Sequence, residues 1–179
     1  MFVRGFFEIP EERILLKYSI ESTYATKIFI FHVLRNQKNV TYYSYDISPR
    51  LLSEVARNHG YKLENFEIRT DYPPRPSYGG WTVIDGIHEI ILRDGVDYTL
   101  NVLSKNMDRT WITVNKLLIG QKPLNILESR IENVYEITYD DNIERYILRV
   151  DKNTKPLSNL KYPFTLTGEG LLVIGAERI

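Results

Sequence analysis

The chain has 179 residues, a length that suits one domain with a sizeable hydrophobic core, and we expect residues 1–179 to form a single domain. Lysine plus arginine and aspartate plus glutamate are balanced at 23 each, so no overall field recruits nucleic acid or an anionic membrane, although a local basic patch is compatible with this balance. Cysteine is absent, which excludes disulfides, thiolate zinc sites and a thiol nucleophile.

The N-terminal stretch Phe2–Phe7 is too short and too interrupted for a signal peptide, and no later apolar run approaches membrane-spanning length. We therefore expect a cytoplasmic protein.

Arg13–Tyr18 then predicts a buried strand, and Tyr24–Asn36 predicts a helix with a buried stripe. Between them, residues 19–23 connect strand to helix without a glycine, because none occurs from Phe6 to His59.

The rest of the chain continues this alternation. Val40–Tyr45 predicts a strand, and Ser48-Pro49 predicts a helix that ends near Gly60. The Pro/Gly-rich stretch Asp71–Gly80 predicts a surface loop rather than a domain linker. The remaining predicted elements are strands at Trp81–Asp85 and Thr110–Asn115, a helix at Val96–Lys105 between them, and terminal strands at Asn133–Tyr139, Glu144–Asp151 and Tyr162–Ile174. This order predicts an α/β fold with a mainly parallel sheet and an antiparallel edge. We expect residues 13–18, 40–45, 81–85 and 110–115 to form its parallel centre.

Three stretches carry a family resemblance. The first runs from Tyr45-Asp46-Ile47-Ser48-Pro49 to His59-Gly60 and on to Phe66, and the second is Trp81–Ile87, a strand that ends in Asp85. The third combines Arg149–Lys155 with a terminal hairpin that begins Tyr162-Pro163-Phe164. Together they resemble the RecA-like ATPases, specifically the single-domain KaiC-like branch of the archaeal type. The resemblance implies a three-layer core of the P-loop NTPase kind, and it covers most of the chain from Arg13 onward.

The phosphate-binding loop of that family is degenerate here. A phosphate cradle needs glycines that turn backbone N–H groups inward and a lysine that reaches the outer phosphates. The lysine position falls on Tyr24 or Ala25, and Lys27 follows Thr26 inside the helix, in the wrong order. The resemblance also implies an adjacent acidic pair after the second strand, of which only Asp46 remains.

These departures define a vestigial nucleotide site. In a working ATPase an aspartate at the position of Asp85 holds magnesium beside the phosphates; here Asp85 and Asp46 are interpreted as relic carboxylates. The other candidate residues, which could offer hydroxyls or block phosphate, are Ser19, Glu21, Ser22, Thr23, Tyr24 and Thr26. Glu21 would repel phosphate, and an aromatic ring could occupy the space that the phosphate would take. We therefore expect Tyr24, or alternatively Tyr18, to fill the site. We expect no catalytic residues, no cofactor and no metal.

Two loops raise the alternative of DNA contacts. The segment Asn115–Asn125, with Lys116 and Lys122, lies where RecA-like proteins place DNA-contacting loops. The Pro-rich loop mixes the cations Arg69 and Arg75 with Tyr72 and Tyr78, as single-strand binders do. The three histidines lack metal-ligand spacing: His32 is interpreted as a packed residue, and His59 and His88 as surface or cap positions.

The leading hypothesis is a non-catalytic RecA/KaiC-like domain that acts as a regulatory or interaction subunit, with an ATP-competent relative or a second copy of the chain as partner. The alternatives are an accessory protein of DNA recombination or repair that binds single-stranded DNA, and a weak ATPase with an unconventional phosphate loop. Many tyrosines and isoleucines without cysteine are typical of thermophiles.

Overall fold

A computed structural model describes residues 10–75, 79–105, 108–155, 157 and 160–174 of the protein. Its strands are β1 (Ile14–Tyr18), β2 (Val40–Ser44), β3 (Phe66–Arg69), β4 (Trp81–Asp85), β5 (Thr110–Asn115), β6 (Asn133–Asp140), β7 (Arg145–Lys152), β8 (Lys161–Thr167) and β9 (Gly170–Val173). Its helices are the 3₁₀ turn η1 (Ile20–Ser22), α1 (Thr23–Leu34), α2 (Pro49–Asn58), α3 (Ile87–Asp94), α4 (Val96–Leu103), α5 (Lys116–Ile119) and α6 (Gln121–Arg130). Among the described residues, no helix has both the length and the apolarity needed to cross a membrane.

The nine strands form one mixed sheet in the order β3-β2-β4-β5-β1-β6-β7-β8-β9. The pairs from β3 to β6 are parallel, and those from β6 to β9 are antiparallel. The predicted parallel centre is therefore confirmed, because β1, β2, β4 and β5 cover the four expected segments. β1 lies between β5 and β6 and is buried along its whole length, which explains its nearly unbroken apolar sequence.

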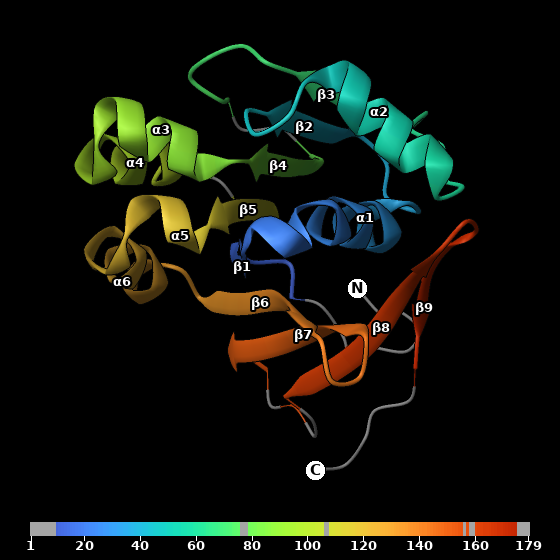
Figure 1. The fold of residues 1–179 in the computed structure, drawn as a ribbon. Coiled ribbons are helices and arrows are strands. Elements are labelled where there is room, and N and C mark those ends of the chain that lie inside the picture. The colour runs from blue at the N-terminus through green and yellow to red at the C-terminus, as the bar shows by residue number, and fades with distance from the viewer. Residues whose placement is uncertain (1–9, 76–78, 106–107, 156, 158–159, 175–179) are drawn as a thin grey trace.

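Helices cover both faces of the parallel part, so the fold has three layers (Figure 1). α1 and α2 pack on one face, and α3 to α6 pack on the other. α1 is buried on most of its surface because α2 and β9 cover its outer side. This explains why its sequence is apolar over consecutive positions, Ile28 to Phe31, rather than along one stripe.

The terminal hairpin formed by β8 and β9 folds back onto the helices. The carbonyl of Thr167 accepts a hydrogen bond from His59 Nδ1 at 2.7 Å. The hydroxyl of Tyr61, just beyond α2, accepts from the backbone N–H of Leu171 at 3.1 Å and lies 3.0 Å from His32 Nδ1 on α1. The hairpin is thus fastened to both helices of its face.

Three parts of the structure differ from the sequence-based expectation. The segment from Gly86 to Gly95 contains the eight-residue helix α3. It was not predicted because a glycine at each end is typical of a loop. The segment Asn115–Asn125 is not a loop, because α5 and the start of α6 occupy it. The short edge strand β3 was not expected either, because the four residues Phe-Glu-Ile-Arg give too short an alternation of apolar and polar residues to predict a strand.

We expect acid to weaken the protein through His32. Burial, and then the charge of Arg35, lowers the pKa of His32 to about 4. The unfolded chain takes up a proton as the pH falls through about 6.5, whereas the folded chain does so only near 4, so stability falls across that window. The full shift corresponds to about 3 kcal/mol, and partial solvent access should reduce it to roughly half. Urea unfolding of the wild type and of His32→Gln at several pH values measures the difference; identical pH slopes would contradict the expectation.

Candidate functional site

A buried lysine lies at the carboxyl ends of the central strands. Lys27, on the second turn of α1, has a fully buried side chain whose ammonium is 2.6 Å from Asp46 Oδ2 and 2.7 Å from Asp85 Oδ1. Asp85 ends β4, and Asp46 follows β2 by two residues. β2 and β4 are paired neighbours with Ser44 opposite Asp85, so the topology brings the two carboxylates together. We call Lys27, Asp46 and Asp85 the ion cluster.

Two hydroxyl groups hold the ion cluster from the sheet side. Tyr18 donates a hydrogen bond to Asp46 Oδ2 at 2.7 Å, and its ring centre lies 4.9 Å from the Lys27 ammonium, within range of a cation–π contact. Thr113 on β5 donates to Asp85 Oδ1 at 2.6 Å and accepts from the backbone N–H of Gly86 at 2.9 Å. Both carboxylates are therefore fixed by side chains from other strands of the sheet, Asp85 by the neighbouring β5 and Asp46 by β1.

His88, on the first turn of α3, is fully buried beside the ion cluster. Its Nδ1 accepts a hydrogen bond from the backbone N–H of Asn115 at 3.3 Å. In a neutral ring the proton then sits on Nε2, which lies 3.3 Å from Asp46 Oδ1. The interpretation of His88 as a surface or cap residue is wrong, because its place beside Asp46 depends on a helix that the sequence did not reveal.

In the ion cluster one ammonium faces two carboxylates, and the surrounding groups favour the ionised form of Asp46. Burial disfavours the ionised form of Asp46, but the nearby His88 Nε2, at 3.3 Å, and the charge of Lys27 outweigh it and hold the pKa of this carboxyl well below its usual range. Burial, and then the charges of Asp85 and Asp46, raises the pKa of Tyr18 far above its usual value, so its hydroxyl remains a donor. Of the buried polar atoms here, Asp85 Oδ2, His88 Nε2 and the hydroxyl of Tyr42 have no partner in hydrogen-bond geometry in the part of the chain that the structure describes.

The connection from β1 to α1 is short and bonded to itself. Four residues, 19–22, join the two elements, and the last three form the turn η1. The hydroxyls of Thr23 and Thr26 donate to backbone carbonyls one turn earlier, at 2.8 and 2.9 Å, and that of Ser19 donates to the carboxylate of Glu21. The backbone N–H of Ser22 is bonded to the Ser19 carbonyl at 3.0 Å. These groups are therefore committed to the segment itself, whereas the buried hydroxyl of Ser22 has no hydrogen-bond partner among the described residues.

Two solved structures have the same architecture as this chain. The KaiC-like protein PH0186 of Pyrococcus horikoshii superposes with a TM-score of 0.69 at 18% identity, over 95% of this chain and 92% of that one. The flagellar accessory protein FlaH of Methanocaldococcus jannaschii gives 0.71 at 14% identity, over 94% and 92%. The chain has a RecA-like fold.

At these identities the likeness shows the fold alone. No protein-family model matches the chain, and no curated protein matches its sequence.

The ion cluster lies outside the carboxyl ends of parallel strands, the place where open α/β sheets bind ligands. Asp46 and Asp85 do come together there, but the Lys27 ammonium lies between them. Because the ammonium lies against both carboxylates, a magnesium ion bound to them would meet a like charge close by, so the residues as arranged do not fit a magnesium-bound triphosphate. The sequence places Lys27 inside the helix but gives it no role, because nothing local shows what a helical lysine faces.

The expectation that Tyr24 fills the vacated site is wrong. Its side chain is 50% exposed, so it does not occupy a buried space. Tyr18, the alternative, is fully buried and bonded to Asp46. The main occupant of the space is Lys27, a residue that the expectation of a bulky ring did not include.

The candidate DNA-contacting cations do not form one surface in the RecA-like fold. Lys116 holds the buried carboxylate of Glu136, and Lys122 is on α6. Arg69 is on β3 and pairs with Glu67 at 2.6 Å. Two strands, β2 and β4, separate β3 from β5, so the two groups of cations lie apart.

Tyr72 of the Pro-rich loop packs against side chains of α3 and α4 rather than standing open. The ring of Tyr72 has the Arg93 guanidinium 3.5 Å from its centre and the ring of Tyr98 stacked at 6.3 Å. Arg75 is held through its backbone, whose N–H and carbonyl both bond to the hydroxyl of Tyr43. Tyr78 lies outside the described residues. Tyr72 therefore offers little free face to a nucleic acid base.

Proposed function

We propose that this chain is a non-catalytic RecA-like domain that acts as an interaction or regulatory subunit for another protein, with an ATP-competent relative as the best-fitting partner. The observation that carries the proposal is the ion cluster. Lys27 supplies the positive charge that Asp46 and Asp85 would otherwise take from magnesium.

The energetic argument favours the closed state of this site. Breaking a buried ion pair by removing one partner costs about 3–5 kcal/mol. A nucleotide that used Asp46 and Asp85 would have to displace Lys27, and that cost would weaken its binding by roughly 10²- to 4 × 10³-fold. The connection between β1 and α1 adds no free hydroxyl of Ser19, Thr23 or Thr26 in compensation.

The neighbours support an accessory role only in general terms. One of them, FlaH, is a flagellar accessory protein. For this chain we propose only the general role of an accessory subunit that binds other proteins, without a flagellar function. DNA binding is the weaker candidate, because Lys116 is paired with Glu136 and the ring of Tyr72 is stacked on Tyr98 of α4.

Calorimetry with ATP and magnesium, together with a phosphate-release assay, tests the proposal. We expect neither binding heat nor turnover above that of the double variant Asp46→Asn, Asp85→Asn. Turnover that is present in the wild type and lost in this variant would overturn it. A salt-dependent titration with single-stranded DNA serves as the second arm, and tight binding that weakens with salt would favour the DNA-binding alternative.

A further inference from the structure

β3 is an edge strand, and part of its backbone has no hydrogen-bond partner among the described residues. It ends the sheet and pairs with β2 on its inner side (Figure 1). The N–H of Val40 donates to the carbonyl of Asn65 at 3.0 Å, which fixes the phase of this parallel ladder. Glu67 therefore directs its backbone groups at β2, whereas Phe66 and Ile68 direct theirs outward. No described residue bonds to the outward groups of Ile68.

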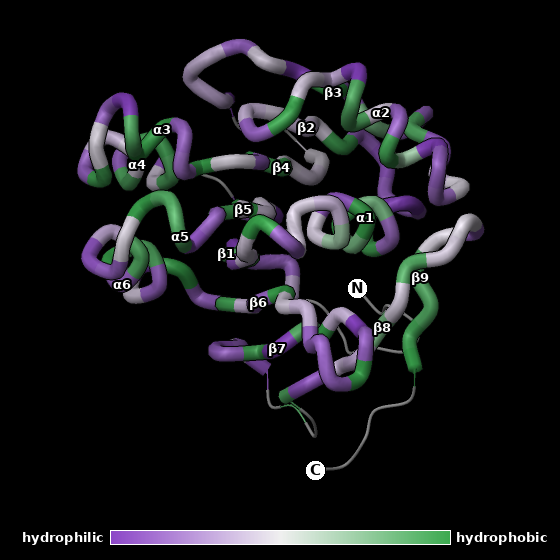
Figure 2. The backbone as a smooth tube through the Cα atoms, in the orientation of Figure 1, coloured by the Kyte–Doolittle hydropathy of each residue, from purple (hydrophilic) through white to green (hydrophobic). Residues whose placement is uncertain are grey.

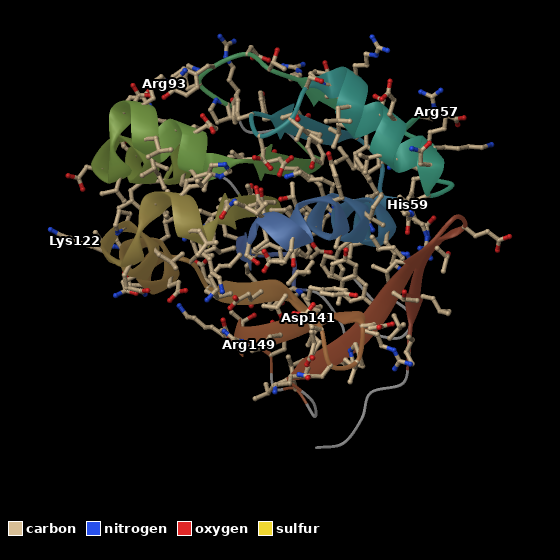
Figure 3. All side chains as sticks on the ribbon, viewed as in Figure 1. Arg57, His59, Arg93, Lys122, Asp141 and Arg149 are labelled. Atoms are coloured by element: carbon tan, nitrogen blue, oxygen red, sulfur yellow. The ribbon has the colours of Figure 1, made fainter. Side chains whose placement is uncertain are left out.

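The opposite edge of the sheet is protected against strand pairing. β9, the strand at that edge, is strongly hydrophobic (Figure 2), but the backbone N–H of its Leu171 is bonded to the hydroxyl of Tyr61. His59 lies beside the tip of the same hairpin and bonds to it (Figure 3). Proteins commonly block open strand edges in such ways, because an open edge pairs with strands of other chains. No described side chain bonds to the backbone of β3 in this manner.

The side chains of β3 alternate between the two faces of the sheet. Phe66 and Ile68 pack against the core on the α1 and α2 side, where the ring centres of Phe66 and Phe31 are 5.4 Å apart. Glu67 and Arg69 therefore share the opposite face. They form an ion pair at 2.6 Å, and their side chains are 61% and 39% exposed. The open edge thus carries one negative and one positive side chain, two residues apart.

This order of charges is complementary to itself. When two β3 strands lie antiparallel and the outward groups of Ile68 bond to those of Ile68 in the other strand, Glu67 of each strand lies opposite Arg69 of the other. The attractive contact therefore occurs twice about the two-fold axis. We propose that β3 pairs antiparallel with β3 of a second copy of this chain, so that the two sheets continue into one another.

Charge also selects this register over the adjacent ones. The outward backbone groups repeat at every second residue, so the pairing can slip only in steps of two residues. A slip in one direction places Glu67 opposite Glu67 of the copy, and a slip in the other direction places Arg69 opposite Arg69. Like charges directly opposite each other destabilise a strand pair, and opposite charges stabilise it. Of these three registers only the proposed one is attractive.

The pairing does not rest on the proposed function, because it uses the outer edge of the sheet and none of the residues of the ion cluster. Sedimentation of the full-length protein over a range of concentrations measures it. β3 is short, so we expect a weak dimer with a dissociation constant of about 10–500 μM.

Charge reversals locate the contact on β3. We expect Glu67→Arg alone and Arg69→Glu alone each to raise the dissociation constant at least about tenfold, because like charges then lie opposite each other at both contacts. The double variant Glu67→Arg, Arg69→Glu exchanges the two charges and should dimerise like the wild type. Lys122→Glu, at a lysine that extends outward from α6 (Figure 3), is the control and should leave the dimer unchanged.

A mixture of the two single variants gives the sharpest result. One variant presents only arginine and the other only glutamate at positions 67 and 69, so the mixture should form a dimer although neither variant does so alone. A wild type that stays monomeric at about 1 mM would overturn the inference. A dimer that both single variants leave intact, or a mixture that stays monomeric although circular dichroism shows both variants folded, would do the same. ATP turnover would sink the proposed function and leave this result standing.

Discussion

Replacing Lys27 with methionine should lower the free energy of unfolding by about 3–5 kcal/mol at neutral pH. The substitution keeps the length of the side chain but leaves Asp46 and Asp85 facing each other without a counter-charge. In a domain of this size such a loss corresponds to a fall in Tm of roughly 6–20 °C. Urea unfolding and thermal melts of the two proteins measure it.

Two further variants separate the charge from the packing. In the Lys27→Met background, Asp85→Asn removes one of the uncompensated charges and should restore part of the lost stability. Lys62→Met, at an exposed lysine, should change stability by less than about 0.5 kcal/mol. A Lys27→Met protein as stable as the Lys62→Met control would show that the ammonium does not balance the two carboxylates.

Replacing Gly86 with alanine should cost about 3 kcal/mol or more. Gly86 has a φ of +90°, and an added Cβ would lie 2.8 Å from both Cβ and the backbone nitrogen of Asp46. The new methyl group must push against the backbone that carries Asp46, so the loss combines strain at a left-handed position with a steric clash. Because Gly86 also donates to Thr113, the damage should reach Asp85.

Gly79→Ala is the matched control for this substitution. Gly79 has a φ of +76°, but no atom within 4 Å would meet its added carbon, so that variant carries the backbone strain alone. We expect Gly86→Ala to be less stable than Gly79→Ala by about 2 kcal/mol in urea unfolding. Equal losses in the two variants would mean that the close approach to Asp46 has no energetic weight.

The sheet could be predicted from the sequence because the local residue pattern of each central strand is enough to predict it. β1 and β4 are short apolar runs between polar turns, and the hairpins at the end of the chain have turn residues at their tips. α3 escaped prediction for an equally local reason. Its eight residues are bracketed by Gly86 and Gly95, so too few turns remained for a helical period to emerge.

The candidate site could be predicted only in part, because its key contact is non-local. Asp46 and Asp85 follow strands, and parallel strands bring their carboxyl ends to one edge, so their proximity could be inferred. The role of Lys27 depends on which side of α1 faces those ends, and on α2 and β9 covering the opposite side. A helix that is buried on most of its surface has no polar stripe to reveal its orientation, so the lysine could not be assigned from spacing.

The position of β1 in the middle of the sheet has a consequence for how the protein is made. β1 is synthesised before the other strands that the structure describes, yet its two neighbours, β5 and β6, are both complete only when residue 140 has been added. Until then this fully buried strand lacks at least one of its two partners, and its apolar side chains are available to chaperones or to other nascent chains. A stalled nascent chain that ends before β6 should therefore stay sensitive to protease, and resistance should arise only once β6 has left the exit tunnel.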